Sequence, residues 1–534
     1  MNRRKFVAGL GAATVTAGGI APPGTASPLT ASATGDPGQT RIEADFDPVE
    51  RSIAELELAQ ARGAVSAEAL TSIYLRRIEQ FDRRGPMLRS VLAVNPDAVA
   101  AARELDRERA QRRLRGPLHG IPILLKDNIE TADPMPTTAG SLALVGARHT
   151  QDSPLAARLR AAGAVILGKA NLSEWANFRS THSCSGWSGV GGQTRCPYQP
   201  ARNPSGSSAG PAAAASASLC AAAVGTETDG SILAPASING LVGLKPTVGL
   251  VSSAGIVPIS SRQDTAGPMT RSVADAALLL SVMAAPRADW PGARWPLEPA
   301  ARGLKLGVMQ SPPSTHPLVE RESQQWFRML ESEGFTLVAV PMPKEWPSLS
   351  DLELEVLLYD FKAELNAYLA RLGATVPVRT LADLIEFNRA HAATEMPYFG
   401  QELFEQSEAC GPRDSPAYRK ALHHLLDLAD TSGLAALFSR YGVDALIASG
   451  NGPAELIDHV WGDRFEDSGG WPPMCSAAAI AGYPSLTVPA AMIEGLPVGI
   501  ALVGRRLQEN TLLRIGLRVE QVMKGRRPPT LTVF

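Results

Sequence analysis

The spacing of apolar residues predicts helices in the first part of the chain. From about Phe46 the apolar side chains recur at helical spacing. Ser66 stands where the cap of one such helix belongs, and a charged helix is predicted over about 96–114. One face of the helix that follows Ser66 is formed by Leu70, Ile73, Tyr74, Ile78 and Phe81.

Short β-rich runs follow and alternate with a helical segment. The runs "GIPILLKD" (120–127) and "GAVILGK" (163–169) flank "SPLAARLRAAG" (153–163), which has a helical pattern. The final part of the chain returns to strands with "DALIASG", "SLTVPAA" and "GLPVGIALVG". Strands alternating with helices are typical of a buried sheet covered by helices. We therefore expect one large α/β domain over 48–527, with a central mixed β-sheet surrounded by helices.

Two segments in the middle of the chain differ in texture. Residues 197–260 are rich in Gly, Ser and Ala, but "PAAAASASLCAAAVG" (211–225) begins with Pro and ends with Gly, as helices often do. This stretch is therefore predicted to be a helix of small residues and not a linker. Residues from about 300 to 440 are more charged, and "LEVLLYDFKAELNAYLARLG" is amphipathic. We expect a helical excursion there that covers the sheet.

The composition excludes several classes of partner. The chain has 534 residues, of which 45% are hydrophobic and 19% charged, and its formal net charge is −2. A chain with this balance is not expected to bind nucleic acid or a membrane surface. The 5 cysteines have irregular spacing that suits neither a metal site nor a disulfide framework. A single bridge between Cys184 and Cys196 stays open, and no metal or cofactor is expected.

The first 33 residues have the three regions of an export signal. Arg3, Arg4 and Lys5 precede the apolar stretch "FVAGLGAATVTAGGIA", and "ASA" at 31–33 is a small-x-small cleavage site. The paired arginines suit a twin-arginine signal. We expect a signal peptide at 1–33, a flexible segment at 34–47 and a C-terminal tail at 528–534. The mature protein is then exported, to the periplasm or beyond.

Lys126 is the candidate base, because the motifs of other catalytic classes are missing. The sequence has no H-E-x-x-H, Walker P-loop or dinucleotide fingerprint, and its 8 histidines are scattered. Lys126 ends an apolar strand, and burial would lower the pKa of its ammonium group and free the amine to accept a proton. A lysine at a strand end is otherwise a surface residue whose stem lies along the sheet.

Two loops supply candidate nucleophiles. "SGSSAG" (205–210) places Ser207 and Ser208 before a predicted helix, whose free N–H groups favour negative charge. In "TETDGSI" (226–232) the backbone N–H groups of Thr228, Asp229, Gly230 and Ser231 could converge on an oxyanion. The structural alternatives are a helix cap for the first loop and an Asx-type turn for the second.

These motifs together resemble the amidase signature family of serine hydrolases. The resemblance spans roughly 48–527 and includes "GIPILLKDN", "GKANLSEWAN", "SGSSAG", "QDTAGPMTRSVADAALLL" and "GYPSLTVPA" in the family's order. It implies that Ser231 is the nucleophile, that Ser207 follows a cis peptide bond and bridges to it, and that Lys126 is the base. It also implies an acyl-enzyme mechanism without a cofactor.

The sequence departs from the common family pattern beside the nucleophile. Asp229 replaces a glycine and Leu233 replaces an arginine, whereas the three triad residues are intact. The segments "TETDGSI", "LSEWANFRS" and "SGWSGVGGQTRCPY" resemble those of bacterial peptide amidases, which release ammonia from C-terminally amidated peptides. The resemblance therefore implies a peptide amide substrate.

Other interpretations of the site remain open at this stage. Small aryl or acyl amides are an alternative substrate class, and an amidotransferase-like subunit is a non-hydrolytic alternative. Trp187 and Tyr198 could line a peptide cleft beside Ser208, or the two aromatic side chains could simply pack in the interior. Asn171 and Glu174 are expected to brace loops near the sheet end, and the protein is expected to be a monomer.

Overall fold

The computed structural model describes residues 46–290, 292, 296–300, 303–310, 316–464 and 471–531. The predicted signal peptide at 1–33 and nearly all of the predicted segment at 34–47 lie outside these residues.

A mixed sheet of 11 strands forms the centre of the molecule, as expected. The strands β2, β3 and β6 pair in parallel, as do β9, β10 and β11, whereas the strands between these groups pair antiparallel. The order across the sheet is β1 (Val91–Val94), β3 (Ala164–Ala170), β2 (Ile121–Lys126), β6 (Ala222–Glu227), β8 (Thr265–Thr270), β7 (Val242–Lys245), β12 (Ser485–Ile493), β13 (Leu496–Gly504), β11 (Ala445–Ser449), β9 (Lys305–Met309) and β10 (Thr336–Val340).

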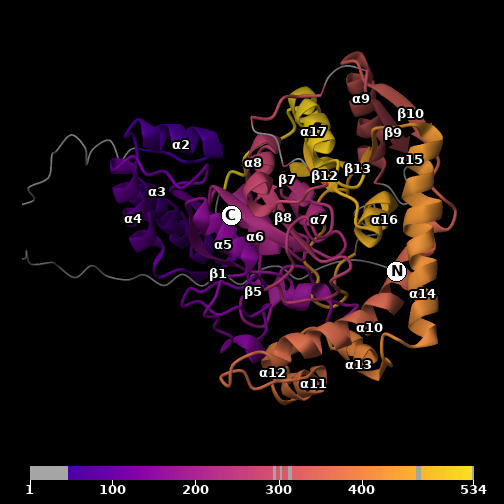
Figure 1. Cartoon of the computed structure of the whole chain (residues 1–534), viewed down its shortest axis with the longest axis horizontal. Coiled ribbons are helices and arrows are strands. Elements are labelled where there is room, and N and C mark those ends of the chain that lie inside the picture. The colour runs from indigo at the N-terminus through magenta and orange to yellow at the C-terminus, as the bar shows by residue number, and fades with distance from the viewer. Residues whose placement is uncertain are drawn as a thin grey trace, which may run out of the picture.

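Helices cover the sheet on both sides, and Figure 1 shows them arranged around it. β2, β3, β6, β12 and β13 are apolar and almost wholly buried, as strands covered on both faces are. The helices in the first half are α2 (Ile53–Ala61), α3 (Ala67–Arg77), α4 (Ala98–Ala110), α5 (Pro154–Ala161), α6 (Ala209–Ser216), α7 (Leu233–Ile238) and α8 (Val273–Met283). Those in the second half are α9 (Pro317–Ser332), α10 (Leu349–Ala370), α11 (Leu381–Ala390), α12 (Ala392–Glu395), α13 (Glu402–Ala409), α14 (Pro416–Leu426), α15 (Ala435–Tyr441), α16 (Pro473–Ala481) and α17 (Glu509–Met523).

The elements predicted at the start of the chain are confirmed. Ser66 caps α3 by accepting a hydrogen bond from the Ala69 N–H at 3.0 Å. The strand–helix–strand unit is β2, α5 and β3, with bounds within about two residues of those expected. β2 and β3 pair in parallel next to each other, which brings the end of β2 into the middle of a buried layer.

The small-residue helix is shorter than the sequence predicts. It begins at Ala209 and ends at Ser216, and the last part of the predicted helix is β6. Alanine has the best helix propensity, but the sheet contacts of β6 with β2 and β8 outweigh this preference. The loop after α6 therefore reverses the chain and places "TETDGSI" at the end of a central strand.

The predicted helical excursion over 300–440 is only partly helical. β9 and β10 lie in this range and extend the sheet at one edge. The helical part proper begins with α10, and in Figure 1 the helices α10–α13 gather at the lower side of the molecule while α14 runs up its right side. Helix α10 packs against α14 and also against α16.

The structure answers whether Cys184 and Cys196 form a disulfide and whether a described helix could cross a membrane. All 5 cysteines are free thiols, so Cys184 and Cys196 are not joined by a disulfide; both are buried. Among the described residues no helix is both long and apolar enough to cross a bilayer.

Candidate active site

Lys126 is the last residue of β2, and its side chain points into the protein. The residue is 0% exposed, and its Nζ lies 2.7 Å from Ser207 Oγ, 2.9 Å from Thr226 Oγ1 and 3.2 Å from the Thr226 carbonyl oxygen. Burial lowers its pKa from 10.5 to about 7, against the opposing attraction of the Asp264 and Glu227 carboxylates. The structure thus supports the buried position of Lys126 over the surface one.

Ser207 lies in the loop that leads into α6. It is 0% exposed, the Gly206–Ser207 peptide bond is cis, and the Ser207 carbonyl accepts a hydrogen bond from the Ser173 N–H at 3.1 Å. A Cβ at Gly206 would collide with Ser173 Oγ and lie 2.7 Å from Ser185 Oγ, so only glycine fits there. The loop is therefore packed tightly from both sides around the serine that contacts Lys126.

Ser231 lies in the turn between β6 and α7. It is 8% exposed, whereas Lys126 and Ser207 are fully buried, so Ser231 is the member of the three that a substrate could reach. Its carbonyl accepts a hydrogen bond from the Ser208 N–H at 3.1 Å, which joins the two serine loops directly. Lys126 contacts Ser207, and the loop of Ser207 is bonded to the backbone of Ser231; the triad itself stays a prediction.

The turn before Ser231 leaves donors free. Within the described part of the chain, the four predicted donors, the backbone N–H groups of Thr228, Asp229, Gly230 and Ser231, donate to no protein acceptor. Gly230 has a φ of 75°, and a Cβ placed on it would be 3.9 Å from the nearest atoms, which belong to Trp471. After Ser231, the N–H of Ile232 donates to the Glu227 carboxylate at 2.7 Å, and this bond fixes the start of α7.

Two further residues belong to the surroundings of Lys126 and were not predicted as site residues from the sequence. Thr226 holds Lys126 with both of its oxygens and also accepts from Asn128 Nδ2 at 2.9 Å. Asp264 accepts from Thr228 Oγ1 at 2.6 Å, and burial raises its pKa to about 7. Both residues belong to motifs that carry the family resemblance, but only the folded structure shows that Thr226 contacts Lys126 and that the Asp264 carboxylate favours its charged form.

The helical part of the chain is tied to the nucleophile turn. Gln263 Nε2 donates to the Thr228 carbonyl at 3.2 Å and to Glu353 Oε1 at 2.5 Å. Glu353 belongs to α10 and is buried. One side chain thus links the turn before Ser231 to the helix that packs over the sheet.

Ser208 and Trp187 are enclosed by the protein. Ser208 is 0% exposed and its Oγ donates to the Thr226 carbonyl at 3.0 Å, so it fastens the start of α6 to β6. Trp187 is 5% exposed and packs edge-on against Phe399, with ring centroids 5.1 Å apart, while the Arg179 guanidinium lies 5.5 Å from its ring. These contacts match the packing alternative for Trp187, and a substrate contact of either residue stays a prediction.

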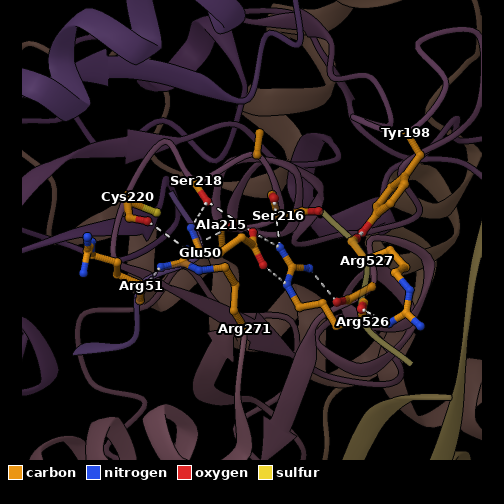
Figure 2. A network of polar contacts seen from close by, with 12 residues as sticks. Glu50, Arg51, Tyr198, Ala215, Ser216, Ser218, Cys220, Arg271, Arg526 and Arg527 are labelled. Carbon is orange, nitrogen blue, oxygen red and sulfur yellow. Dashed lines mark hydrogen bonds and ion pairs between the residues drawn. The ribbon is translucent and has the colours of Figure 1, made fainter. Parts of the chain in front are cut away.

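Tyr198 lies in a polar network at the far end of α6, which Figure 2 shows. Its hydroxyl donates to the Arg527 carbonyl at 2.5 Å. Arg271 donates to the Ala215 carbonyl at 3.0 Å, and Arg526 donates to the Ser216 carbonyl at 3.1 Å. Cations at the last carbonyls of a helix are stabilising, so this network anchors α6 at the end opposite Ser207. A role of Tyr198 in substrate binding also stays a prediction.

Asn171 and Glu174 brace a neighbouring loop, as expected. Asn171 Nδ2 donates to Thr194 Oγ1 at 2.9 Å. Glu174 accepts from the Gly189 N–H at 2.6 Å and pairs with the fully buried Arg179 at 3.0 Å. Both residues therefore hold the 186–194 loop beside the serines. Among the residues that the structure describes, no group of three or more His, Cys, Asp or Glu side chains could hold a metal ion.

Comparisons with known proteins show similarity to amidases over most of the chain. The family model described as Amidase matches residues 69–513. The structure of native peptide amidase from Stenotrophomonas maltophilia is similar with a TM-score of 0.83 and 46% identity, covering 90% of this chain and 99% of that one. A probable amidase of Arabidopsis thaliana is 36% identical over 93% of this chain and 94% of its own length.

A relative named for a different activity is also similar. A glutamyl-tRNA(Gln) amidotransferase component from Chloroflexus aurantiacus is 34% identical over 87% of this chain and 95% of its own length. The chain therefore belongs to the amidase family and is a hydrolase of amide C–N bonds.

Proposed function

We propose that this amidase removes ammonia from C-terminal peptide amides through an acyl-enzyme on Ser231, with Ser207 and Lys126 as a proton relay. The observation that carries the proposal is the 2.7 Å hydrogen bond between buried Lys126 and Ser207, in a loop bonded to the backbone of Ser231. The triad assignment also rests on the match of these three residues to the family's motifs.

The surroundings of Lys126 suit a neutral amine. A neutral amine has two N–H bonds and one lone pair. The two oxygens of Thr226 take the two N–H bonds, which leaves the lone pair to accept the hydroxyl proton of Ser207. A lysine with a pKa of about 7 is well matched to this task near neutral pH.

The first half of the reaction forms the acyl-enzyme. Ser231 Oγ attacks the amide carbonyl carbon and passes its proton to Ser207, which passes its own proton to Lys126. The carbonyl oxygen becomes an oxyanion, and the free N–H groups of Asp229, Gly230 and Ser231 can donate to it. Each such donor is worth about 100- to 1,000-fold in rate. The C–N bond then breaks as the relay returns the proton to nitrogen, which leaves as ammonia.

The second half releases the product. A water molecule attacks the ester carbon while the same relay takes its proton, and the C–O bond to Ser231 breaks with return of a proton to Ser231 Oγ. The products are a peptide with a free C-terminal carboxyl group and a regenerated enzyme. The overall reaction consumes the peptide amide and one water molecule and yields the peptide acid and ammonia.

The substrate class rests on similarity. The chain is 46% identical to a solved peptide amidase and shares its fold over nearly the whole length. The segment "TETDGSI" around the nucleophile carries the same resemblance. Small aryl amides are the alternative substrate for the same residues.

The test is ammonia release by the purified mature chain from a short peptide amide, with the matching aryl amide and the Ser231→Ala variant in parallel. Release from the peptide amide that is lost in the variant supports the proposal. Turnover of only the aryl amide refutes the substrate class and keeps the relay. Silence on both, with ammonia transfer appearing only in the presence of partner proteins, would support the amidotransferase-like alternative.

We further propose that the protein is exported, as its paired Arg3 and Arg4 before an apolar stretch suggest. Fractionation of cells that express the full chain tests this, with an Arg3→Lys, Arg4→Lys double variant as control. Retention of the double variant inside cells supports twin-arginine export. Equal distribution of both proteins refutes it.

A further inference from the structure

We propose that Asn203 and Asn239 are positioning residues that set the placement of Ser207 relative to Ser231; this inference rests on the proposed function. Neither residue carries chemistry of its own in the relay. Together they hold the two sides of the short backbone segment that leads into Ser207.

Asn239 joins the two serine-bearing segments with one side-chain amide. It follows the last residue of α7, the helix that begins directly after the Ser231 turn, and it is 0% exposed. Its Nδ2 donates to the Pro235 carbonyl within α7 at 2.7 Å and to the Pro204 carbonyl in the Ser207 loop at 2.8 Å. The Asn239 side chain thereby holds the Pro204 carbonyl next to α7, the helix that follows Ser231.

Asn203 holds the same loop from the other side. Its Oδ1 accepts from the Ser205 N–H at 2.7 Å, and its Nδ2 donates to Asp463 Oδ1 at 2.7 Å. The same Asp463 oxygen also accepts from the Ser185 N–H at 2.7 Å. Ser205 has a positive φ of 59°, so its backbone is bent two residues before Ser207 and is held in that bend by a side chain.

The backbone next to Asn239 is held by the polar network at the C-terminal end of α6. Arg526 donates to the carbonyl of Gly240, the residue after Asn239, at 2.7 Å. A Cβ at Gly240 would lie 2.7 Å from the Tyr198 hydroxyl, so this position is closely packed. Figure 2 shows Arg526 and Tyr198 in this network. Asn239 thus has a rigid base from which to hold Pro204.

The two asparagines act on the side of Ser207 that its other contacts do not reach. Ser173 holds the Ser207 carbonyl, Lys126 holds its hydroxyl, and the following Ser208 N–H donates to the Ser231 carbonyl at 3.1 Å. Asn239 and Asn203 hold the preceding backbone at Pro204 and Ser205. Misplacing a catalytic group by about 1 Å can cost roughly 100-fold in rate, so the spacing between the two loops directly affects the rate.

The test compares Asn239→Leu with Asn388→Leu, a closely matched control. Asn388 in α11 is also 0% exposed, its Nδ2 donates to Gln401 Oε1 at 3.0 Å, and in both asparagines Oδ1 is a buried acceptor without a partner in the described part of the chain. Both variants lose a buried amide, but only Asn239 touches the serine loops.

The readouts are kcat and KM for a peptide amide, the rate of Ser231 sulfonylation by phenylmethylsulfonyl fluoride, and Tm. We expect Asn239→Leu to lower kcat and the sulfonylation rate by about 10- to 100-fold with KM nearly unchanged, while Asn388→Leu lowers Tm alone. Equal kcat in the two variants overturns the inference.

A second variant covers the case in which Asn239→Leu does not fold. Asn203→Asp keeps an acceptor for the Ser205 N–H but replaces the donor to Asp463 by a repelling carboxylate, and it should lower kcat in the same way. An unchanged kcat in that folded variant likewise overturns the inference. A wild-type chain that hydrolyses no amide would instead refute the proposed function, so the two failures are distinguishable.

Discussion

The acid limb of the pH–rate profile should report the protonation of Lys126. Only the neutral amine can accept the Ser207 proton, so kcat/KM should follow the fraction of neutral lysine. Burial lowers the pKa of Lys126 from 10.5 to about 7, which corresponds to roughly 5 kcal/mol against the charged form in the folded protein. Without this burial the base would be almost wholly protonated at neutral pH.

The assay is the initial rate of ammonia release from a peptide amide between about pH 5 and 9.5. We expect kcat/KM to level off above neutral pH and to fall about tenfold for each pH unit well below the apparent pKa of about 7. A rate that stays constant down to pH 5 would refute the assignment of Lys126 as the base.

An Asp264→Asn substitution gives a sharper form of the same test. The Asp264 carboxylate is the foremost group that favours the ammonium form of Lys126. Removing its charge should move the acid limb to lower pH. Asp82→Asn is the control, because Asp82 is also buried and accepts from the N–H of Ser90 but lies outside the site. A limb that moves upward, or moves equally in both variants, contradicts the electrostatic reasoning.

The same titrations predict how stability depends on pH. Between about pH 7 and 10.5 the unfolded chain binds more protons at Lys126 than the folded chain, so this residue makes stability rise with pH across that window. The pKa of Asp264 is raised from 3.8 to about 7, so between these values the folded chain binds more protons and stability falls as pH rises. Unfolding by urea at several pH values, with Asp264→Asn for comparison, measures both contributions.

Four further predictions concern the proposed triad and the thiols. Ser231→Ala should lower kcat on the order of 10,000-fold, and Ser207→Ala by about 100- to 10,000-fold because water can partly replace the bridging hydroxyl, both with unchanged circular dichroism; near-normal activity of Ser231→Ala would end the mechanism. Lys126→Met should abolish turnover yet raise stability at pH 6 by ~1–4 kcal/mol, since a buried ammonium group is replaced by an apolar side chain of similar size; a lower Tm than wild type at that pH would contradict this. Thiol titration of the unfolded, unreduced chain should count 5 free cysteines, and a count of 3 would indicate that a disulfide forms after all.

The sequence alone determined the elements whose cause is local. The apolar run of β2 and its terminal Lys126, the Ser66 cap of α3 and the order of the family motifs could all be read from neighbouring residues. The three residues of the proposed triad could be predicted from their motifs before any contact was known. These features need only propensity, capping and pattern, which act over a few residues.

Only the tertiary structure decided features that depend on residues far apart in the chain. The alanine-rich stretch after 216 becomes β6 because β2 and β8 pair with it, and β9 and β10 are strands within a largely helical region because an open sheet edge accepts them. Thr226 meets Lys126 across 100 residues, and Asn203 meets Asp463 across 260. The spacing of residues along the sequence does not predict such pairs, because they form only when the chain packs and each buried polar group must find a partner.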